Sequence, residues 1–126
     1  METCDIMVVE DDTAIAGLYA TFLNLMPYSF EVVTSGEDAM ELIKRIKFAV
    51  CILDINLGYK SMTGVDLAVE IKKINKDTKV YALTGNVFLF DGFDPAIAGF
   101  DDVFSKPLGY QDILVILDNL LGKSCT

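Results

Sequence analysis

Short apolar runs alternate with longer segments of helical periodicity along this chain. Each apolar run has the length of a β-strand, and the runs lie at 5–9, 30–34, 49–53, 79–83 and 102–105. Apolar side chains also recur every three or four positions, as in helices packed against a core, at 13–26, 35–46, 64–75 and 110–121. Strands that alternate with helices predict an α/β fold in which a parallel sheet carries helices on both faces.

Residues with capping chemistry mark several of the predicted helix ends. Asp12 or Thr13 stands before the first helix, and Asp12 taken alone is better explained as an N-cap than as a ligand. Ser35 is followed three residues later by Asp38, which resembles a capping box. Gly122 follows the last helix and is a typical stop residue.

The helical periodicity also predicts which side chains face the core. In the first helix the apolar positions are Ile15, Leu18, Tyr19, Phe22 and Met26. In the second they are Ala39, Leu42, Ile43 and Ile46, and in the third Leu67, Ala68, Ile71 and Ile74. The segment 86–99 fits no long helix because Gly92 and Pro95 interrupt it, although a short one can start there.

Composition narrows the class of protein. The chain has 126 residues and a formal net charge of −9, which suits one acidic domain and argues against unaided binding to nucleic acid. No apolar run reaches the length that a membrane span needs, and the first residues carry acids where a signal peptide carries bases. We therefore expect a cytoplasmic protein that contacts neither membrane nor nucleic acid directly.

The residue types available for chemistry are limited. The chain contains no histidine, which excludes histidine-based triads and histidine metal sites. Its three cysteines are far apart and fit no zinc or redox spacing, and Cys51 is expected to be a small core residue. Chemistry must therefore use carboxylates, lysine, hydroxyl groups or a bound metal ion.

Charged side chains stand where the predicted strands end. The buried run VCIL at 50–53 ends in Asp54, and the first strand ends in Glu10 and Asp11. Thr84 follows the fourth strand and Lys106 follows the fifth. Because ligands bind at the carboxyl ends of strands in open α/β sheets, we expect these groups to meet in one crevice if the first and third strands are neighbours.

A cluster of bare carboxylates would repel itself unless a cation neutralised it. Magnesium prefers oxygen ligands from one or two carboxylates, completed by waters and a phosphate group. With Lys106 as a further positive charge and the Thr84 hydroxyl as a donor, such a site suits phosphoryl transfer. The opposing interpretation, in which the acids only face water, does not explain why four strand ends carry complementary groups.

These residues resemble the receiver domain of two-component response regulators. The matching motifs are VVED at 8–11, LDIN at 53–56, LTGN at 83–86 and SKP at 105–107. The resemblance covers essentially the whole chain, so 1–126 is expected to be a single receiver domain. It implies a doubly wound, flavodoxin-like sheet of five parallel strands in the order 2-1-3-4-5.

The resemblance also implies a role for each residue. Asp54 would accept a phosphoryl group from a histidine kinase or a phosphotransfer protein, Lys106 would pair with Asp54 and then with the phosphoryl group, and Thr84 would hydrogen-bond a phosphoryl oxygen. Mg²⁺ would be held by Glu10, Asp11, Asp54 and the main-chain carbonyl of Asn56. The Lys106–Pro107 bond would be cis. The domain would promote its own phosphorylation and dephosphorylation without being an enzyme, and it would signal through a face near the fourth and fifth strands.

Four departures from the family pattern affect the expected switch. Gly58 replaces a proline that is frequent there, and the loop at 58–63 is about two residues longer than usual. Val103 occupies the position of a switching Tyr or Phe, while Phe104 beside it is expected to point the other way. The segment 86–99 carries Phe88, Phe90 and Phe93, which either pack in the core or form a partner-binding patch.

Three other functions remain to be compared with a phosphorylated switch. A pseudo-receiver would keep the fold as a phosphorylation-independent interaction module. Val103 and the interrupted helix pattern at 86–99 keep this alternative open, while the intact set of Asp11, Asp54, Thr84 and Lys106 argues against it. A nucleotide or flavin binder would need a phosphate loop after the first strand, where the sequence has EDDTA. A haloacid-dehalogenase phosphatase would need Asp where Asn56 stands.

No output domain follows residue 122, and the sequence leaves open whether the chain is a stand-alone receiver with a separate output protein or part of a longer one.

Overall fold

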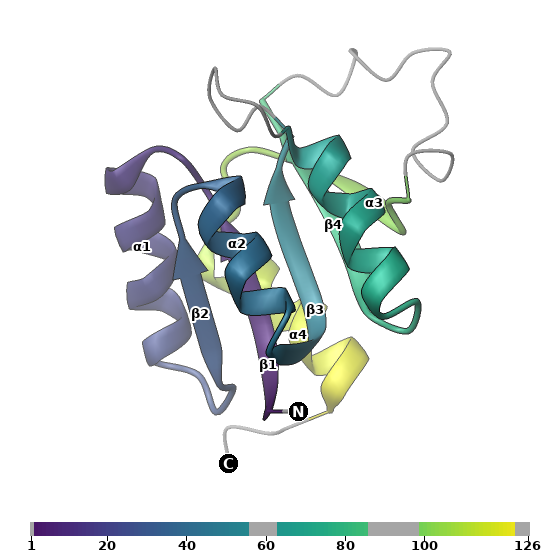
Figure 1. Cartoon of the computed structure of the whole chain (residues 1–126). Coiled ribbons are helices and arrows are strands. Elements are labelled where there is room, and N and C mark those ends of the chain that lie inside the picture. Colours follow the sequence, from purple (N-terminus) through teal and green to yellow (C-terminus); the bar gives the residue numbers. More distant parts are fainter. Residues whose placement is uncertain (1, 56–62, 86–98, 123–126) are drawn as a thin grey trace.

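The computed structural model describes residues 2–55, 63–85 and 99–122, in which strands and helices alternate (Figure 1). In chain order the elements are β1 (Glu2–Val9), α1 (Thr13–Asn24), β2 (Phe30–Val33), α2 (Gly36–Ile43), β3 (Ile46–Asp54), α3 (Gly64–Ile74), β4 (Lys79–Thr84), β5 (Asp102–Ser105) and α4 (Tyr110–Leu121). The predicted alternation is confirmed for every one of these elements.

All neighbouring strands pair in parallel, in the order β2-β1-β3-β4-β5. This confirms the predicted doubly wound, flavodoxin-like topology, with β2 at an edge. The register pairs Val9 of β1 with Leu53 of β3, and Asp54 with Leu83 of β4. The carboxyl ends of the three central strands therefore lie side by side.

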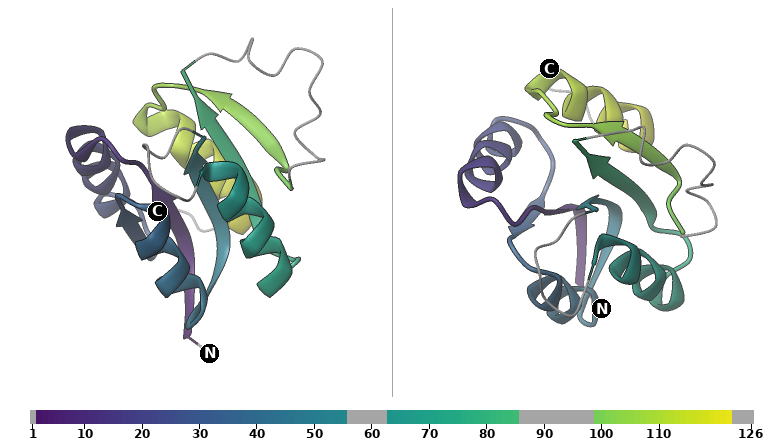
Figure 2. Two further views of the ribbon diagram at one scale, coloured as in Figure 1. Left: turned by 45° about the horizontal axis from the view of Figure 1, so that its top comes forward. Right: turned by 90° about the horizontal axis from the view of Figure 1, so that it is seen from above.

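Helices cover both faces of the sheet: α2 and α3 lie on one face, and α1 and α4 on the other (Figure 2). Alternate residues of β1 and β3 face opposite layers, as the pleat requires. Met7 and Cys51 pack with α2 and α3, whereas Ile6 and Val50 pack with α1 and α4. Both central strands are buried on both sides, which explains their continuous apolar runs.

The predicted N-cap and stop residues are confirmed, but the capping box expected from Ser35 and Asp38 is only half formed, since the return bond from the Ser35 N–H to the Asp38 side chain is not made. The Asp12 side chain accepts hydrogen bonds from the first turn of α1, and Ser35 accepts one from the N–H of Asp38. Gly122 ends α4 in the left-handed conformation, with φ of 68°. A full capping box that the prediction had not named joins Thr63 and Asp66 at the start of α3.

Some boundaries and orientations were predicted wrongly. Ile46 belongs to β3 and not to the preceding helix, because β1 and β3 already pair from Glu2 and Ile46 onward. Leu18 and Ile74 were expected to face the core, yet they are 46% and 43% exposed. Both lie at the border of an apolar stripe, where spacing alone does not separate a buried from an exposed position.

Several predicted features lie outside the described residues: the short helix at 86–99, its three phenylalanines, Gly58, and the loop at 58–62. Within the described part of the chain, no helix has both the length and the apolar character needed to cross a membrane.

Candidate functional site

The site is built on the carboxyl ends of β1 and β3. Glu10 directly follows β1, and Asp54 is the last residue of β3, so the pairing of Val9 with Leu53 brings their side chains together. Only 1% of Glu10 and 2% of Asp54 is exposed. Two carboxylates buried this deeply require a compensating positive charge.

Lys106 supplies that charge. Its ammonium nitrogen lies 2.7 Å from Oδ2 of Asp54 and 3.2 Å from Oε2 of Glu10. The backbone N–H of Lys106 donates to the carbonyl oxygen of Thr84 at 2.7 Å, which holds the loop after β5 against the end of β4. The Lys106–Pro107 peptide bond is cis, as the resemblance implies.

A group of oxygen ligands stands beside this ion pair. One carboxylate oxygen from each of Glu10, Asp11 and Asp54 can be chosen so that all three lie within 4.8 Å of one another. Asp11 is exposed, so the group opens to solvent on one side. Asp12, in contrast, caps α1. A donor set made only of carboxylate oxygens, with one face open to water, fits a hard divalent cation such as Mg²⁺.

The clustered acids change one another's affinity for protons. Burial, with the negative charge of Asp54, raises the pKa of Glu10 from 4.5 to about 7, although Lys106 acts in the opposite direction. Burial, together with a hydrogen bond to Asp54 and the charge of that residue, raises the pKa of Asp11. Burial works against the charged form of Lys106, but its hydrogen bond to Asp54 and the two carboxylates raise its pKa overall. The lysine therefore stays charged, while Glu10 and Asp11 keep their protons to a higher pH than usual.

The remaining predicted residues are Thr84 and Asn56. Thr84 ends β4 beside the end of β3, and it is 1% exposed, so this residue lies buried at the same end of the sheet as Asp54. Asn56 lies outside the described residues. Among the described residues, the structure thus brings together Glu10, Asp11, Asp54, Thr84 and Lys106 at one end of the sheet.

Two residues at the site were not singled out from the sequence. Gly64 begins α3, and a Cβ added there would lie 2.5 Å from the carbonyl oxygen of Asp54. The helix can approach this strand end only because residue 64 has no side chain. Tyr19 was predicted as a core residue, and its ring is buried, but its hydroxyl makes no hydrogen bond of standard geometry. Burial raises the pKa of this hydroxyl, and the nearby Glu10 carboxylate adds to the rise.

The aromatic arrangement of β5 follows the prediction. Val103 packs with the core under α2 and α3, whereas Phe104 packs with the opposite layer. The ring of Phe104 stacks edge-on against Tyr81 of β4, with centroids 5.3 Å apart. An aromatic side chain is therefore present on β5, but on the face opposite to Val103.

Comparison with known proteins identifies the group to which this arrangement belongs. The chain is 26% identical over 93% of its length to the regulatory protein LuxO of Vibrio cholerae, and 25% identical over 97% to the transcriptional regulatory protein RprY of Bacteroides fragilis. It spans only 25% of the first protein and 51% of the second.

A solved structure and a family profile agree with these relatives. The response regulator TrrA of Thermotoga maritima, solved in complex with Mg²⁺ and BeF, superimposes with a TM-score of 0.77 at 26% identity, covering 96% of this chain and 100% of that one. The sequence profile named response regulator receiver domain matches residues 6–118. The chain therefore belongs to the response regulator receiver domain family of two-component signalling.

Proposed function

We propose that this chain is a phosphorylation-dependent switch, that 1–126 is a single receiver domain, and that Asp54 accepts the phosphoryl group. The observation that carries the proposal is the placement of the Asp54 carboxylate, which lies 2.7 Å from the Lys106 ammonium at the buried end of a strand and beside two further acids. A carboxylate held there by packing alone would be costly. The free-energy cost of burying the Asp54 carboxylate is explained if this carboxylate serves as a nucleophile.

In the proposed step, a carboxylate oxygen of Asp54 attacks the phosphorus of a phosphohistidine on a partner protein. The new bond is an acyl phosphate, and the phosphorus–nitrogen bond breaks, with its electrons remaining on the histidine nitrogen. Lys106 then shifts its hydrogen bonds from the carboxylate to a phosphoryl oxygen and keeps the added negative charge paired. The Thr84 hydroxyl donates to another phosphoryl oxygen. The chain acts on itself and is not an enzyme with a separate substrate.

Magnesium would be held by Glu10, Asp11 and Asp54, with Asn56 adding a main-chain carbonyl. When bound, the ion supplies positive charge that offsets the crowded acids and draws the phosphoryl oxygens toward Asp54. The oxygen-only donor set supports this assignment. The Mg²⁺ and BeF in the structure of the similar protein TrrA also support it.

The proposed output is a change on the face near β4 and β5. Thr84 ends β4, and its carbonyl already accepts from the N–H of Lys106. Movement of Thr84 toward a phosphoryl group would therefore be transmitted to the loop that follows β5. Because Val103 replaces an aromatic residue, we expect the Phe104–Tyr81 pair to report the change instead.

The proposed partners are a sensor histidine kinase or a histidine phosphotransfer protein as donor, and an output protein or output domain as receiver of the signal. In this proposal the chain works in the cytoplasm and contacts no membrane or nucleic acid itself. The similar proteins LuxO and RprY are regulatory proteins longer than this chain, which supports coupling to an output function.

The proposal is tested by incubating the chain with acetyl phosphate and Mg²⁺ and reading its intact mass. We expect the mass of one phosphoryl group to be added. We expect no added mass when EDTA removes the metal before the donor is added. A protein that folds normally but gains no phosphoryl group from acetyl phosphate or from a phosphorylated phosphotransfer protein would favour the alternative of a phosphorylation-independent interaction module.

A further inference from the structure

The basic residues of this acidic chain are concentrated in one region. Seven of the ten lysines and arginines fall within the stretches 44–47 and 72–79. These stretches are the ends of α2 and α3 and the starts of β3 and β4, at the opposite end of the sheet from Asp54. The other layer has no counterpart, because α1 and α4 contain no lysine or arginine.

Helix dipoles do not account for this distribution. Cations near a helix C-terminus are stabilising, and Lys72 and Lys73 occupy the last turn of α3. Lys47, Lys76 and Lys79, however, lie outside any helix. The last turns of α1 and α4 carry no basic residue, although these helices are as long as α3 and have a similar dipole.

Neighbouring acids neutralise only part of this charge. Three of the seven bases make ion pairs: Lys72 with Asp101 at 2.8 Å, Lys73 with Glu70 at 3.4 Å, and Lys44 with Glu41 at 4.0 Å. The other four are exposed and make no ion pair with any described residue: Arg45, Lys47, Lys76 and Lys79. We call these four residues the basic cluster.

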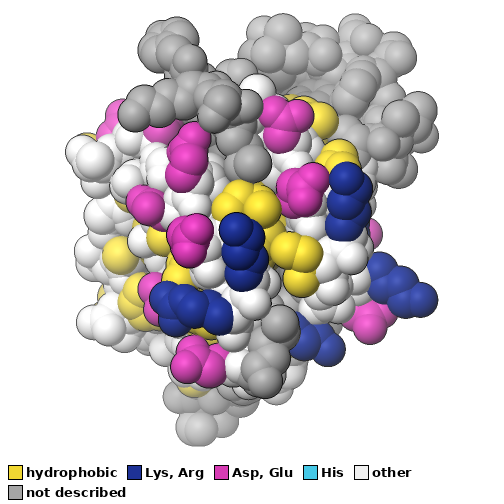
Figure 3. Space-filling model, viewed as in Figure 1, with side chains coloured by type: hydrophobic (Ala, Val, Ile, Leu, Met, Phe, Trp, Pro, Cys, Tyr) yellow, Lys and Arg dark blue, Asp and Glu magenta, His cyan; other side chains and the backbone are white. Residues whose placement is uncertain are grey.

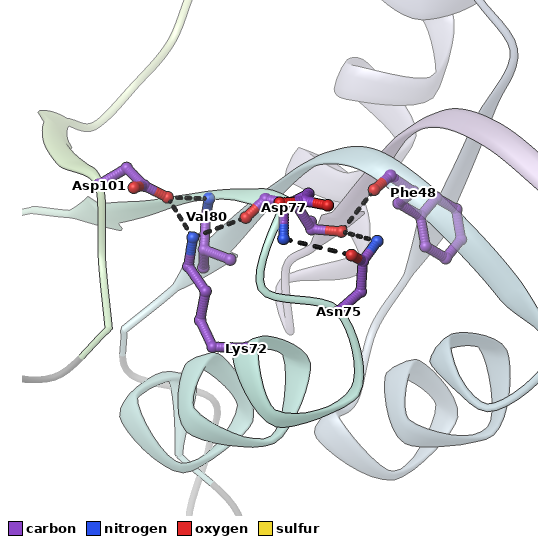
Figure 4. A network of polar contacts seen from close by, with 7 residues as sticks. Phe48, Lys72, Asn75, Asp77, Val80 and Asp101 are labelled. Carbon is purple, nitrogen blue, oxygen red and sulfur yellow. Dashed lines mark hydrogen bonds and ion pairs between the residues drawn. The ribbon is translucent and has the colours of Figure 1, made fainter.

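A rigid polar network holds the backbone that presents the basic cluster (Figure 4). The Lys72 ammonium donates to the carbonyl of Thr78 at 2.7 Å and to the carboxylate of Asp101, which also accepts from the N–H of Val80. The Thr78 hydroxyl donates to the carbonyl of Phe48 at 2.6 Å, and the Asn75 amide donates to that hydroxyl. The turn after α3 is therefore fastened to the starts of β3 and β4, and Lys47, Lys76 and Lys79 project from a fixed frame.

The surface between these bases is grooved and partly apolar. An open groove of about 330 Å³ has two cations in its lining, Lys47 and Lys79, and one acid, Asp77. Leu120 and Leu121 of α4 add apolar walls. Ile74, which is 43% exposed, directly precedes Asn75, a residue that lines the groove. Figure 3 shows basic side chains beside an apolar area on the face covered by α2 and α3, with acidic side chains among them. The region can therefore accept both a carboxylate and an apolar side chain.

We propose that the basic cluster and its groove bind a short acidic segment of a partner protein that also carries apolar side chains. Charge complementarity identifies the occupant, because two unpaired cations and one acid line a groove with apolar walls, and Arg45 and Lys76 add positive charge at the same end of the sheet. The net charge of −9 makes a short acidic peptide a better partner than an extended polyanion. A nucleic acid or an anionic membrane would reach beyond the four cations and meet the acids that dominate the rest of the surface.

The test uses the full chain and a fluorescent synthetic peptide of Asp, Glu and Leu, followed by anisotropy. Lys47→Gln/Lys79→Gln removes two cations from the groove. Gln111→Glu/Asn119→Asp on α4 changes the net charge by the same amount with side chains of similar size. Removing two exposed charges of this kind is expected to weaken binding by roughly fivefold, because each is worth up to about 1 kcal/mol. The α4 variant should bind within about twofold of the parent chain, because its changes lie outside the groove.

Equal weakening in both variants would overturn the proposal, as would failure of the parent chain to bind the peptide. Tighter binding of a DNA duplex or of phosphatidylserine vesicles than of the peptide would also overturn it. A peptide in which Asn and Gln replace the acids should not bind. Since this surface is remote from Asp54, Asp54→Asn should bind the acidic peptide as well as the parent does, so the result stands apart from the proposed phosphorylation.

Discussion

The ammonium of Lys106 lies 2.7 Å from Oδ2 of Asp54, and only 2% of Asp54 is exposed. The same ammonium lies 3.2 Å from Glu10, so one cation compensates two buried carboxylates. In a medium of low polarity each carboxylate would otherwise be left with a large desolvation cost. This relationship governs both the stability of the site and its chemistry.

Removing Lys106 should therefore destabilise the fold. We expect Lys106→Met to lower the free energy of unfolding by about 3 kcal/mol in metal-free buffer, because two buried acids lose their counter-ion. The matched control is Lys79→Met, at an exposed lysine without an ion pair to a described residue, which should change stability by no more than about 0.5 kcal/mol. Urea unfolding of the three proteins measures the difference, and equal stability of both variants would contradict the pairing.

The raised pKa of Glu10 predicts how stability depends on pH. The folded chain holds the Glu10 proton up to a pKa of about 7, whereas the unfolded chain releases it near 4.5. Between these values the folded state binds more protons, so this group makes stability fall as the pH rises. The contribution of one group is at most about 1.4 kcal/mol per pH unit.

Glu10→Gln should remove this contribution. In metal-free buffer the stability difference between Glu10→Gln and the parent chain should grow in favour of the variant between pH 4.5 and about 7. Asp11, whose pKa is also raised, keeps part of the slope in the variant. A stability difference that is independent of pH across this window would show that Glu10 is ionised normally.

Gly64 should be intolerant of any side chain. A Cβ there would lie 2.5 Å from the carbonyl oxygen of Asp54 and 2.9 Å from the Cα of Ile55. We expect Gly64→Ala to cost roughly 1–3 kcal/mol of stability through overpacking, and to slow phosphorylation by shifting the end of β3.

The control for Gly64 is Gly17→Ala in α1. A Cβ at Gly17 meets nothing within 4 Å, and replacing a helical glycine should stabilise the fold by up to about 1 kcal/mol. Thermal unfolding of the two variants should therefore move in opposite directions. A Gly64→Ala protein as stable as the parent would mean that α3 is free to move away from Asp54.

Asp11 should matter more for magnesium than for the fold. Without metal, Asp11→Ala should raise thermal stability slightly, because the pKa of Asp11 is raised by burial and by its neighbour Asp54. Loss of a direct ligand should weaken Mg²⁺ binding by at least about tenfold. Glu31→Ala, at an exposed acid on β2, is the control and should leave the affinity unchanged. Calorimetric titration that gives equal affinities for both variants would rule out Asp11 as a ligand.

The sequence predicts which residues lie together at the carboxyl end of the sheet because parallel topology constrains their placement strongly. Once β1 and β3 are neighbours, the residues that end them must meet, so Glu10, Asp11 and Asp54 could be placed together without coordinates. The end of β4 and the loop after β5 add Thr84 and Lys106 for the same reason. The fold follows from the alternation of apolar runs and helical periodicity, which each strand and helix satisfies independently.

Features that depend on contacts distant in sequence could not be predicted in this way. Gly64 is required by the backbone of Asp54, and a glycine before a helical pattern gives no signal of that contact. The start of β3 at Ile46 is set by pairing with β1, while the local spacing favoured helix. The polar network of Lys72, Thr78 and Asp101 joins three separate turns, so no single stretch of sequence contains its pattern.

The most direct test of the central claim is to locate the phosphoryl group. The chain is incubated with acetyl phosphate and Mg²⁺, the acyl phosphate is reduced with borohydride to homoserine, and the digested protein is sequenced by mass spectrometry. We predict homoserine at position 54 in the parent chain and none in Asp54→Asn, whose circular dichroism spectrum should match that of the parent. Homoserine at position 11 would show that Asp11 is the acceptor, and a product one methylene longer than homoserine at position 10 would show that Glu10 is; either result would contradict the account. Labelling of Asp54→Asn equal to that of the parent chain would contradict the assignment of Asp54.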